Sequence, residues 1–392
     1  MAWKWYVWVF LLLGVMIIVL IGLIIYTVGG IGLSGVELEE CGVLQNNNGK
    51  INIVFFSEKK DAEKYVNYFL NFYPFVDFQN AFNFFYINSY KPKCELYKGI
   101  AILCYSRELI KKAGSCPNDY IVVLEDREQS LRSSSYVNVM SINSRQPLSV
   151  LAHEFAHVFA NLAEEYVPAK IPRGAPNCPG DCSGFEGREN GCYDGCSETE
   201  KIRSIENGIM RTLRSKDYGS FNDVFIIGRI NEESSGEEAV GVSPSEEPTI
   251  NTFMDPLIVG RAINDEGRAD CSREKYYLIE GRLSDENIEV NSRSVEMGCI
   301  GDNGYGGFNY DLIMKDGGSL KGGKFNPELI FTAAPGSDEE GLIDGDVFVS
   351  DRNFLLRIPI IENSRELEIM ADEILLGSIN LYDIGGRACL LE

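Results

Sequence analysis

Apolar residues in the first half of the chain recur at spacings that alternate between those of strands and those of helices. Compact apolar runs of strand length alternate with segments whose apolar residues share one helical face, as Tyr65, Phe69 and Phe72 do. The predicted strands are residues 51–56, 83–87 and 121–124, and the predicted helices are residues 61–72 and 107–113. Strands that alternate with helices in this way predict a mixed α/β layer.

Residues 136–142 show the period of two that is typical of a strand, and they lead into a longer helical segment. Asn143 and Ser144 are both competent N-caps for that helix, and Pro147 is tolerated in its first turn. If the strand lies at a sheet edge along a cleft, an extended peptide can pair with it. The same pattern also fits an internal strand.

The second half of the chain has a succession of short strands without convincing helices, which is typical of a β-sandwich. The predicted strands are residues 257–262, 276–283, 288–295, 308–314, 329–332, 354–361 and 366–381, the last with a turn. An acidic segment rich in Ser and Glu at residues 231–249 is predicted to be a linker. The chain therefore divides into an α/β domain at residues 51–230 and an immunoglobulin-like β-sandwich domain at residues 250–392.

The N-terminal residues 1–36 are the least polar part of the chain. No residue from Trp5 to Val36 is charged, and about twenty apolar residues span a bilayer. The run is longer than the apolar core of a signal peptide, so a transmembrane anchor is predicted rather than a cleaved signal. Lys4 precedes the run and three glutamates follow it. This predicts a single-pass protein of the cell membrane, with a tether at residues 37–50 and its C-terminal bulk outside.

The formal charge of −22 argues against partners that are themselves strongly negative. An acidic surface repels phosphate backbones, so nucleic acid is not expected as a partner. The 11 cysteines would form disulfides outside the cell, and an odd number leaves at least one thiol over. Four cysteines cluster at residues 178–196, where two disulfides are predicted and a second zinc site is the alternative. A bridge between Cys271 and Cys299 is also compatible with the sequence.

The most informative stretch is the helical segment at residues 151–166, which contains both histidines of the chain. His153, Glu154 and His157 match the pattern H-E-x-x-H, and the four-residue spacing lets the two imidazoles share one ion. Zn²⁺ suits two imidazoles, one carboxylate and an open position for water. Glu154 lies about 100° further round the helix, which predicts a general base rather than a ligand. A chance match on a buried helix is the alternative, but it would leave three polar side chains in need of partners.

The segment HEFAHVFANLAEEY resembles the metal helix of the IgA-peptidase-type zinc metallopeptidases of bacteria and archaea. Further similarity lies in residues 118–123, 141–143 and 206–210, so that the resemblance covers roughly residues 50–230. It implies a zinc peptidase related to the metzincins, in which a turn containing methionine lies beneath the metal. In this chain the methionine would be Met210.

The family pattern Gly-Leu-Ala-Asp-Glu-Tyr falls on residues 161–166, with Asn in place of Gly and Glu in place of Asp. The resemblance therefore implies Glu164 as the third zinc ligand. In a straight helix Glu164 would lie about 10 Å along the axis from His157, which is too far to share an ion. The chain must then turn back at Asn161, a residue type that tolerates the left-handed conformation. The alternative third ligands are Glu165 and, if the helix continues, Asp181 or Asp194.

These predictions converge on a membrane-anchored extracellular zinc endopeptidase, with Glu154 as the general base and a protein or peptide as the substrate. The candidate donors to the developing oxyanion are Tyr166, Tyr193 and Tyr218. The competing hypothesis is a non-catalytic cell-surface binding or adhesion protein with a relic zinc domain, in which the β-sandwich does the binding. The intact Glu154 favours the enzyme. The sequence carries no signal for an oligomeric state.

Overall fold

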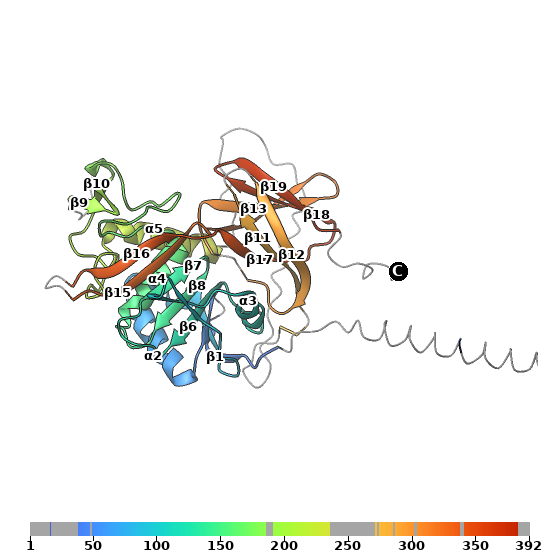
Figure 1. Ribbon diagram of the computed structural model, residues 1–392, viewed down its shortest axis with the longest axis horizontal. Helices are drawn as coiled ribbons and strands as arrows, with labels where there is room; N and C mark the ends of the chain where they lie inside the picture. The colour runs from blue at the N-terminus through green and yellow to red at the C-terminus, as the bar shows by residue number, and fades with distance from the viewer. Residues whose placement is uncertain are drawn as a thin grey trace, which may run out of the picture. The chain divides into compact units, whose positions relative to one another are not determined.

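The central element of the fold is an eight-stranded sheet to which both halves of the chain contribute (Figure 1). The computed structural model describes Met16 and residues 38–47, 49–185, 191–235, 271–272, 274–284, 287–301, 304–337 and 341–382. Residues 38–392 form one compact unit. The strand order of the sheet is β1-β3-β2-β6-β8-β7-β15-β16. The strands are β1 (Gly42–Gln45), β2 (Ile51–Phe56), β3 (Phe82–Ile87), β6 (Tyr120–Glu125), β7 (Ser133–Tyr136), β8 (Val139–Asn143), β15 (Leu329–Pro335) and β16 (Ile343–Val349).

The middle of this sheet is parallel. β2 pairs in parallel with β3 and β6, and β6 pairs in parallel with β8, whereas β1, β7, β15 and β16 are antiparallel to their neighbours. All six residues of β2 are buried, because a parallel strand in the middle of a sheet is covered on both faces. The strands predicted at residues 51–56, 83–87 and 121–124 are confirmed to within one residue at each end.

One face of the sheet is covered by α2 (Lys59–Leu70), α4 (Ser149–Ala160) and α5 (Ser220–Ser235). Their apolar side chains share one core with sheet residues such as Ile53 and Phe55. Burial of this kind is the main stabilising term for a helix, since its own propensity contributes little. The core therefore fixes the position of α4 against the sheet.

The opposite face is covered by α3 (Arg107–Ala113), which has the predicted bounds, and by strands from the C-terminal part of the chain. The strands on this face belong to a three-stranded sheet, β12-β11-β17. A four-stranded sheet, β14-β13-β18-β19, shares a further core with β11 and β17. Val54 of β2, which lies in this second core, is joined there by Leu278 and Leu355 from the C-terminal strands. The strand bounds are β11 (Lys275–Leu283), β12 (Ile288–Met297), β13 (Phe308–Met314), β14 (Ser319–Phe325), β17 (Asn353–Pro359), β18 (Ser364–Ala371) and β19 (Ile374–Asn380).

The predicted fold class, a metallopeptidase domain followed by a separate β-sandwich, is wrong. The described part of residues 38–392 is mostly β-structure within one compact unit, and β15 extends the main sheet by pairing with β7 (Figure 1). The physical reason is that β2 has a second apolar face, which the C-terminal strands cover. Residues 231–235 of the predicted linker belong to α5. The rest of the linker and the predicted strand at residues 257–262 lie outside the described residues.

The segment predicted as one strand at residues 136–142 is a hairpin of β7 and β8. Val137 has a φ of 55°, and Tyr136 pairs with Val139 across the turn. β7 also includes residues 133–135, three buried serines without any apolar signal. β7 is an internal strand, because β15 pairs with its other side.

The prediction of an N-terminal transmembrane helix, and with it of a single-pass location in the cell membrane, is not supported. Among the described residues, no helix combines the length and the apolar character that crossing a membrane requires. Apart from Met16, residues 1–36 lie outside the part of the chain that the structure describes.

Five disulfides connect the described cysteines, and the pair of bridges predicted at residues 178–196 is confirmed. The bonded pairs are Cys41–Cys116, Cys94–Cys104, Cys178–Cys196, Cys182–Cys192 and Cys271–Cys299. Cys389, the remaining cysteine, lies outside the described residues. Disulfides in this number are typical of a protein that folds in an oxidising compartment.

Candidate metal centre

Helix α4 carries the H-E-x-x-H motif, and every one of its residues is buried. Leu151 and Phe155 pack into the core between α4 and the sheet, which fixes the rotation of the helix and hence the direction of the motif. The helix begins after Leu148, which has helical backbone angles and makes no side-chain cap. The predicted N-caps at Asn143 and Ser144 are therefore wrong.

Helix α4 ends at Ala160, because Asn161 adopts the left-handed conformation with φ 52° and ψ 34°. The predicted break at Asn161 is thus confirmed. Its side chain is held at both ends: Nδ2 donates to the carbonyl of Arg173 (2.8 Å), and Oδ1 accepts from Nδ2 of Asn326 (3.2 Å). A glycine could take the same backbone angles but could not form these two hydrogen bonds.

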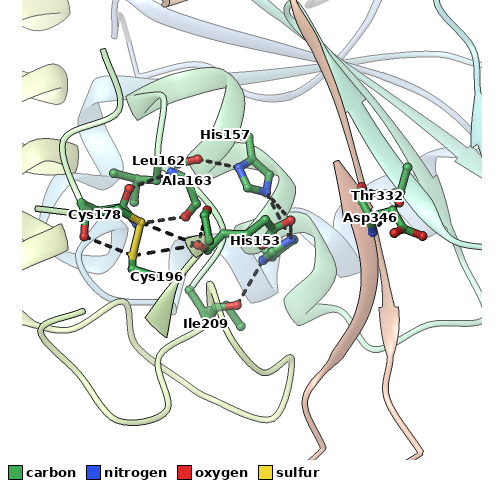
Figure 2. A network of polar contacts seen from close by, with 12 residues as sticks. His153, His157, Leu162, Ala163, Cys178, Cys196, Ile209, Thr332 and Asp346 are labelled. Carbon is green, nitrogen blue, oxygen red and sulfur yellow. Dashed lines mark hydrogen bonds and ion pairs between the residues drawn. A yellow bond between two sulfur atoms is a disulfide. The ribbon is translucent and has the colours of Figure 1, made fainter. Parts of the chain in front are cut away.

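The two histidines of α4 direct their Nε2 atoms toward a common point (Figure 2). Nδ1 of His153 donates to the carbonyl of Ile209 (3.1 Å), and Nδ1 of His157 donates to the carbonyl of Leu162 (2.7 Å). A carbonyl can only accept, so each Nδ1 carries a proton and each Nε2 faces the centre. The two Nε2 atoms are 3.3 Å apart.

Glu164 comes back to the histidines after the turn at Asn161. Its Oε1 lies 3.4 Å from Nε2 of His153 and 3.2 Å from Nε2 of His157. Ligands that surround a zinc ion tetrahedrally at about 2.0–2.1 Å are about 3.3 Å from one another, so the three donor atoms have the separations that one ion requires. Neither Glu164 oxygen accepts a hydrogen bond from another described residue. The donor set and its spacing therefore fit zinc.

Glu154 is a second buried carboxylate beside this triangle. Its side chain is 0% exposed, and neither of its oxygens has a hydrogen-bond partner among the described residues. It has an oxygen within 4.8 Å of ligand atoms of both histidines. Burial raises the pKa of Glu154 to about 8, although the neighbouring His153 lowers it in part. A buried carboxylate whose pKa is raised, next to a candidate metal centre, is a candidate general base.

The charges of the centre are strongly coupled. Burial disfavours the charge on His153, but the carboxylates of Glu164 and Glu154 outweigh it and raise the pKa of His153 to about 9. Burial likewise disfavours the charge on Glu164, but the two imidazoles outweigh it and lower the pKa of Glu164 to about 2. Glu164 is therefore ionised, which is the state in which a carboxylate binds a metal ion.

Glu165, the fallback ligand, has other partners. Its Oε1 accepts from Nδ2 of Asn222 (2.8 Å) and from Nδ2 of Asn177 (3.4 Å). Its backbone N–H donates to the carbonyl of Met210 (3.0 Å), and the carbonyl of the preceding Ile209 holds His153. The turn at Met210 is thus hydrogen-bonded both to the segment that contains Glu164 and Glu165 and to helix α4. Its position beneath a metal stays a prediction.

The disulfide loop supports Glu164 through its backbone (Figure 2). Asn177 forms two hydrogen bonds with the backbone of Ala163: its Oδ1 accepts from the N–H (2.7 Å), and its Nδ2 donates to the carbonyl (2.9 Å). The hydroxyl of Ser197 donates to the carbonyl of Glu164 (2.8 Å). The Cys178–Cys196 disulfide joins the residues next to these two partners. No sequence pattern indicates the role of Asn177, because its partners are backbone groups of Ala163, 14 positions away.

Of the other residues predicted for the site, only Tyr166 lies beside the candidate centre with a hydroxyl that is free among the described residues. Asp181 and Asp194 are exposed in the cysteine loop, and neither belongs to the group of possible metal ligands around the two histidines. Tyr193 is half-buried against Arg203, and the hydroxyl of Tyr218 donates to a backbone carbonyl of α4. Tyr166 lies beside Glu164, and burial together with that carboxylate raises its pKa well above the usual range. Its hydroxyl has no hydrogen-bond partner within the described part of the chain. Tyr166 is therefore the tyrosine that the geometry favours.

A residue that the sequence did not associate with the centre is Phe331 of β15. Its ring stacks on the imidazole of His157, with the ring centroids 3.9 Å apart and an interplanar angle of 14°. The two residues lie far apart in the chain, and the sequence pattern around Phe331 predicts a separate β-sandwich domain. No local pattern could have brought them together.

Comparison with known proteins gives no family for this chain. No model of a known protein family matches the sequence, and no curated protein is significantly similar to it.

Proposed function

We propose that this chain is a zinc-dependent peptidase in which His153, His157 and Glu164 would hold the ion. The observation that supports the metal is the triangle of donor atoms with sides of 3.2, 3.3 and 3.4 Å. The observation that carries the catalytic part is Glu154. It is a buried carboxylate that forms no hydrogen bond with the described residues and is not needed to complete the triangle.

The residues around the triangle have distinct tasks in this proposal. Zinc bound there supplies Lewis-acid chemistry, which polarises a carbonyl group and makes water easier to deprotonate. Glu154 accepts the proton of the attacking water and later donates it to the leaving amine. The hydroxyl of Tyr166 is placed to donate a hydrogen bond to the carbonyl oxygen as negative charge develops on it. The backbone bonds to the two Nδ1 atoms keep both imidazoles in orientation.

The test of this proposal is the exchange Glu154→Gln in the full chain. The amide keeps the shape of the side chain but cannot act as a base, so we expect zinc to be bound in the same amount and hydrolysis of an unfolded protein to fall at least about 100-fold. Zinc is measured by elemental analysis and hydrolysis by mass spectrometry of the products. Glu63→Gln on α2, where the side chain is half exposed, is the matched control and should leave both unchanged. Undiminished hydrolysis by the Glu154→Gln variant would contradict the mechanism.

The second candidate function is a non-catalytic binding protein that uses zinc only for stability. One observation favours it: His153, Glu154 and Glu164 are all 0% exposed, whereas a catalytic zinc must admit a substrate. A purely structural site, however, has no use for Glu154. If zinc is bound stoichiometrically and stabilises the fold, but neither the wild type nor any variant hydrolyses peptides, this second function is the correct one.

A further inference from the structure

The donor atoms of the candidate centre have no access to solvent. His153, Glu154 and Glu164 are 0% exposed, and His157 is 3% exposed. A cavity lined in part by His157, Asn161 and Phe331 has room for no more than about one water molecule. A polypeptide substrate therefore cannot reach the centre in this conformation.

The centre is covered by the hairpin of β15 and β16. Phe331 of β15 stacks on His157, and Gly345 of β16 lies against Tyr166. A Cβ atom at Gly345 would be 2.5 Å from the Tyr166 hydroxyl oxygen and 2.4 Å from the carbonyl oxygen of Thr332, so the backbone of β16 is in direct contact with this tyrosine. In Figure 2 the hairpin runs past the histidines at Thr332 and Asp346.

Two sets of polar contacts attach the hairpin to segments on either side of the centre. Arg132, just before β7, forms ion pairs with Asp344 (2.6 Å) and with Asp346. Thr212, just after the Met210 turn, donates from its hydroxyl to the carbonyl of Gly341 (2.6 Å). The attachments hold the hairpin between β7 and the Met210 turn.

We propose that the hairpin β15–β16 is a built-in closure of the centre, and that the peptidase is latent until the hairpin separates from β7. This inference rests on the proposed function. β15 pairs antiparallel with β7, and an extended peptide would pair with an exposed strand in the same manner. The chain's own strand occupies the position beside the metal helix that a substrate strand needs. The paired residues are Phe331 with Ser135, Thr332 with Ser134, and Ala333 with Ser133.

The contacts of the hairpin explain why it is closed at rest and can still open. Ala333 and Ile343 lie in the large core around α4, so the closed state is the stable one. The pairing of β15 with β7, however, involves only three pairs of facing residues. In addition, β16 is the outermost strand of the sheet. The carboxylates that bind Arg132 are 60% exposed at Asp344 and 49% exposed at Asp346. Exposed ion pairs are weak and screened by salt, so modest changes can shift the equilibrium toward the open state.

The reactivity of the histidines tests the closure without reference to catalysis. The chain has two histidines, and both are in the centre, so their modification by diethyl pyrocarbonate reports on access to it. In the full-length, metal-free protein we expect slow modification. The double exchange Asp344→Asn and Asp346→Asn should accelerate it about tenfold, because removing two exposed ion pairs shifts the opening equilibrium by about that factor. Phe331→Ala, which removes the ring on His157, should accelerate it further.

The matched control is Asp372→Asn. Asp372 is 62% exposed and forms an ion pair with Arg173, outside the hairpin, and its exchange should leave histidine modification unchanged. Hydrogen exchange of the backbone amides at residues 329–349 shows whether each variant loosens the hairpin. If these amides exchange faster while the histidines stay protected, the hairpin is not the closure. If neither variant alters exchange or modification, the hairpin belongs to the permanent core, and the inference is equally overturned.

Hydrolysis by the zinc-loaded variants separates this inference from the proposed function. We expect the Asp344→Asn and Asp346→Asn variant to hydrolyse an unfolded protein about tenfold faster than the wild type, and Glu154→Gln added to it to abolish the gain. Accessible histidines with bound zinc and no hydrolysis would support the closure and refute the peptidase. Rapid hydrolysis and rapid histidine modification in the wild type would refute the closure and leave the peptidase standing.

Discussion

Oε1 of Glu164 lies 3.2 Å from Nε2 of His157, although the two residues are seven positions apart and the helix that carries His157 has ended between them. The contact exists because Asn161 reverses the chain in the left-handed conformation. Three residues later the side chain of Glu164 is back beside the helix. The geometry of the candidate centre therefore depends on the backbone angles of one residue.

The left-handed backbone at Asn161 predicts that a glycine variant is more stable than an alanine variant, which is the reverse of the order within a helix. Asn161→Gly loses two side-chain hydrogen bonds but keeps the backbone angles, whereas Asn161→Ala loses the same bonds and is strained in the left-handed region. We expect the free energy of unfolding of the alanine variant to be lower than that of the glycine variant by about 1–2 kcal/mol. Urea denaturation of the metal-free proteins measures this difference. In a regular helix alanine would be the more stable of the two, so that order would contradict the account.

The assignment of Glu164 as a ligand predicts a selective loss of metal affinity. Glu164→Ala should weaken zinc binding by at least about 100-fold, since it removes one of three protein ligands. The neighbouring exchange Glu165→Gln is the control. It keeps an oxygen that can accept from Asn222, so we expect its zinc affinity to change less than about tenfold. Competition with a chromophoric chelator gives both values. A greater loss for Glu165→Gln than for Glu164→Ala would reverse the assignment.

A buried aspartate on α5 predicts a dependence of stability on pH. Asp223 is 7% exposed, and burial together with the charge of Asp217 raises its pKa to about 7. In the unfolded chain the pKa is about 4, so between these values the folded state binds more protons than the unfolded state. The contribution of Asp223 to stability is then present at low pH and is lost as the pH rises from about 4 to about 7.

The exchange Asp223→Asn should remove this dependence. We expect the stability of the variant relative to the wild type to increase with pH across that window and to change little above about pH 8. Urea denaturation at a series of pH values provides the measurement. Asp61→Asn, at an exposed position in the first turn of α2, is the control and should show no such trend. A relative stability of Asp223→Asn that falls with pH would have the wrong sign.

The parts of the centre that could be predicted from the sequence are those that local geometry determines. The spacing of His153 and His157 follows from the helical period, and the break at Asn161 follows from the distance that Glu164 would otherwise have to cover. Short strands such as β2 were visible because burial on both faces makes them uniformly apolar. In each case the informative residues lie within about fifteen positions of one another.

The parts that could not be predicted depend on pairing between distant segments. The serines of β7 are polar, so no apolar pattern marks them as buried. They can be buried because they form hydrogen bonds such as that from the Ser134 hydroxyl to the carbonyl of Ile102 (2.5 Å). The attachment of β15 to β7 joins segments about two hundred positions apart, and nothing in either segment specifies the partner. The contact of Phe331 with His157 follows from that pairing. A prediction from local patterns therefore separates two halves that the fold unites.

The central claim is that one zinc ion is held by two imidazoles and a carboxylate on this chain. X-ray absorption at the zinc edge of the zinc-loaded full chain tests it most directly, because nitrogen or oxygen ligands at about 2.0–2.1 Å are distinguished from sulfur at about 2.3 Å. The account predicts two imidazoles, additional oxygen and no sulfur. A sulfur shell, or fewer than two imidazoles, would place the metal elsewhere in this cysteine-rich chain and contradict the assignment of His153, His157 and Glu164.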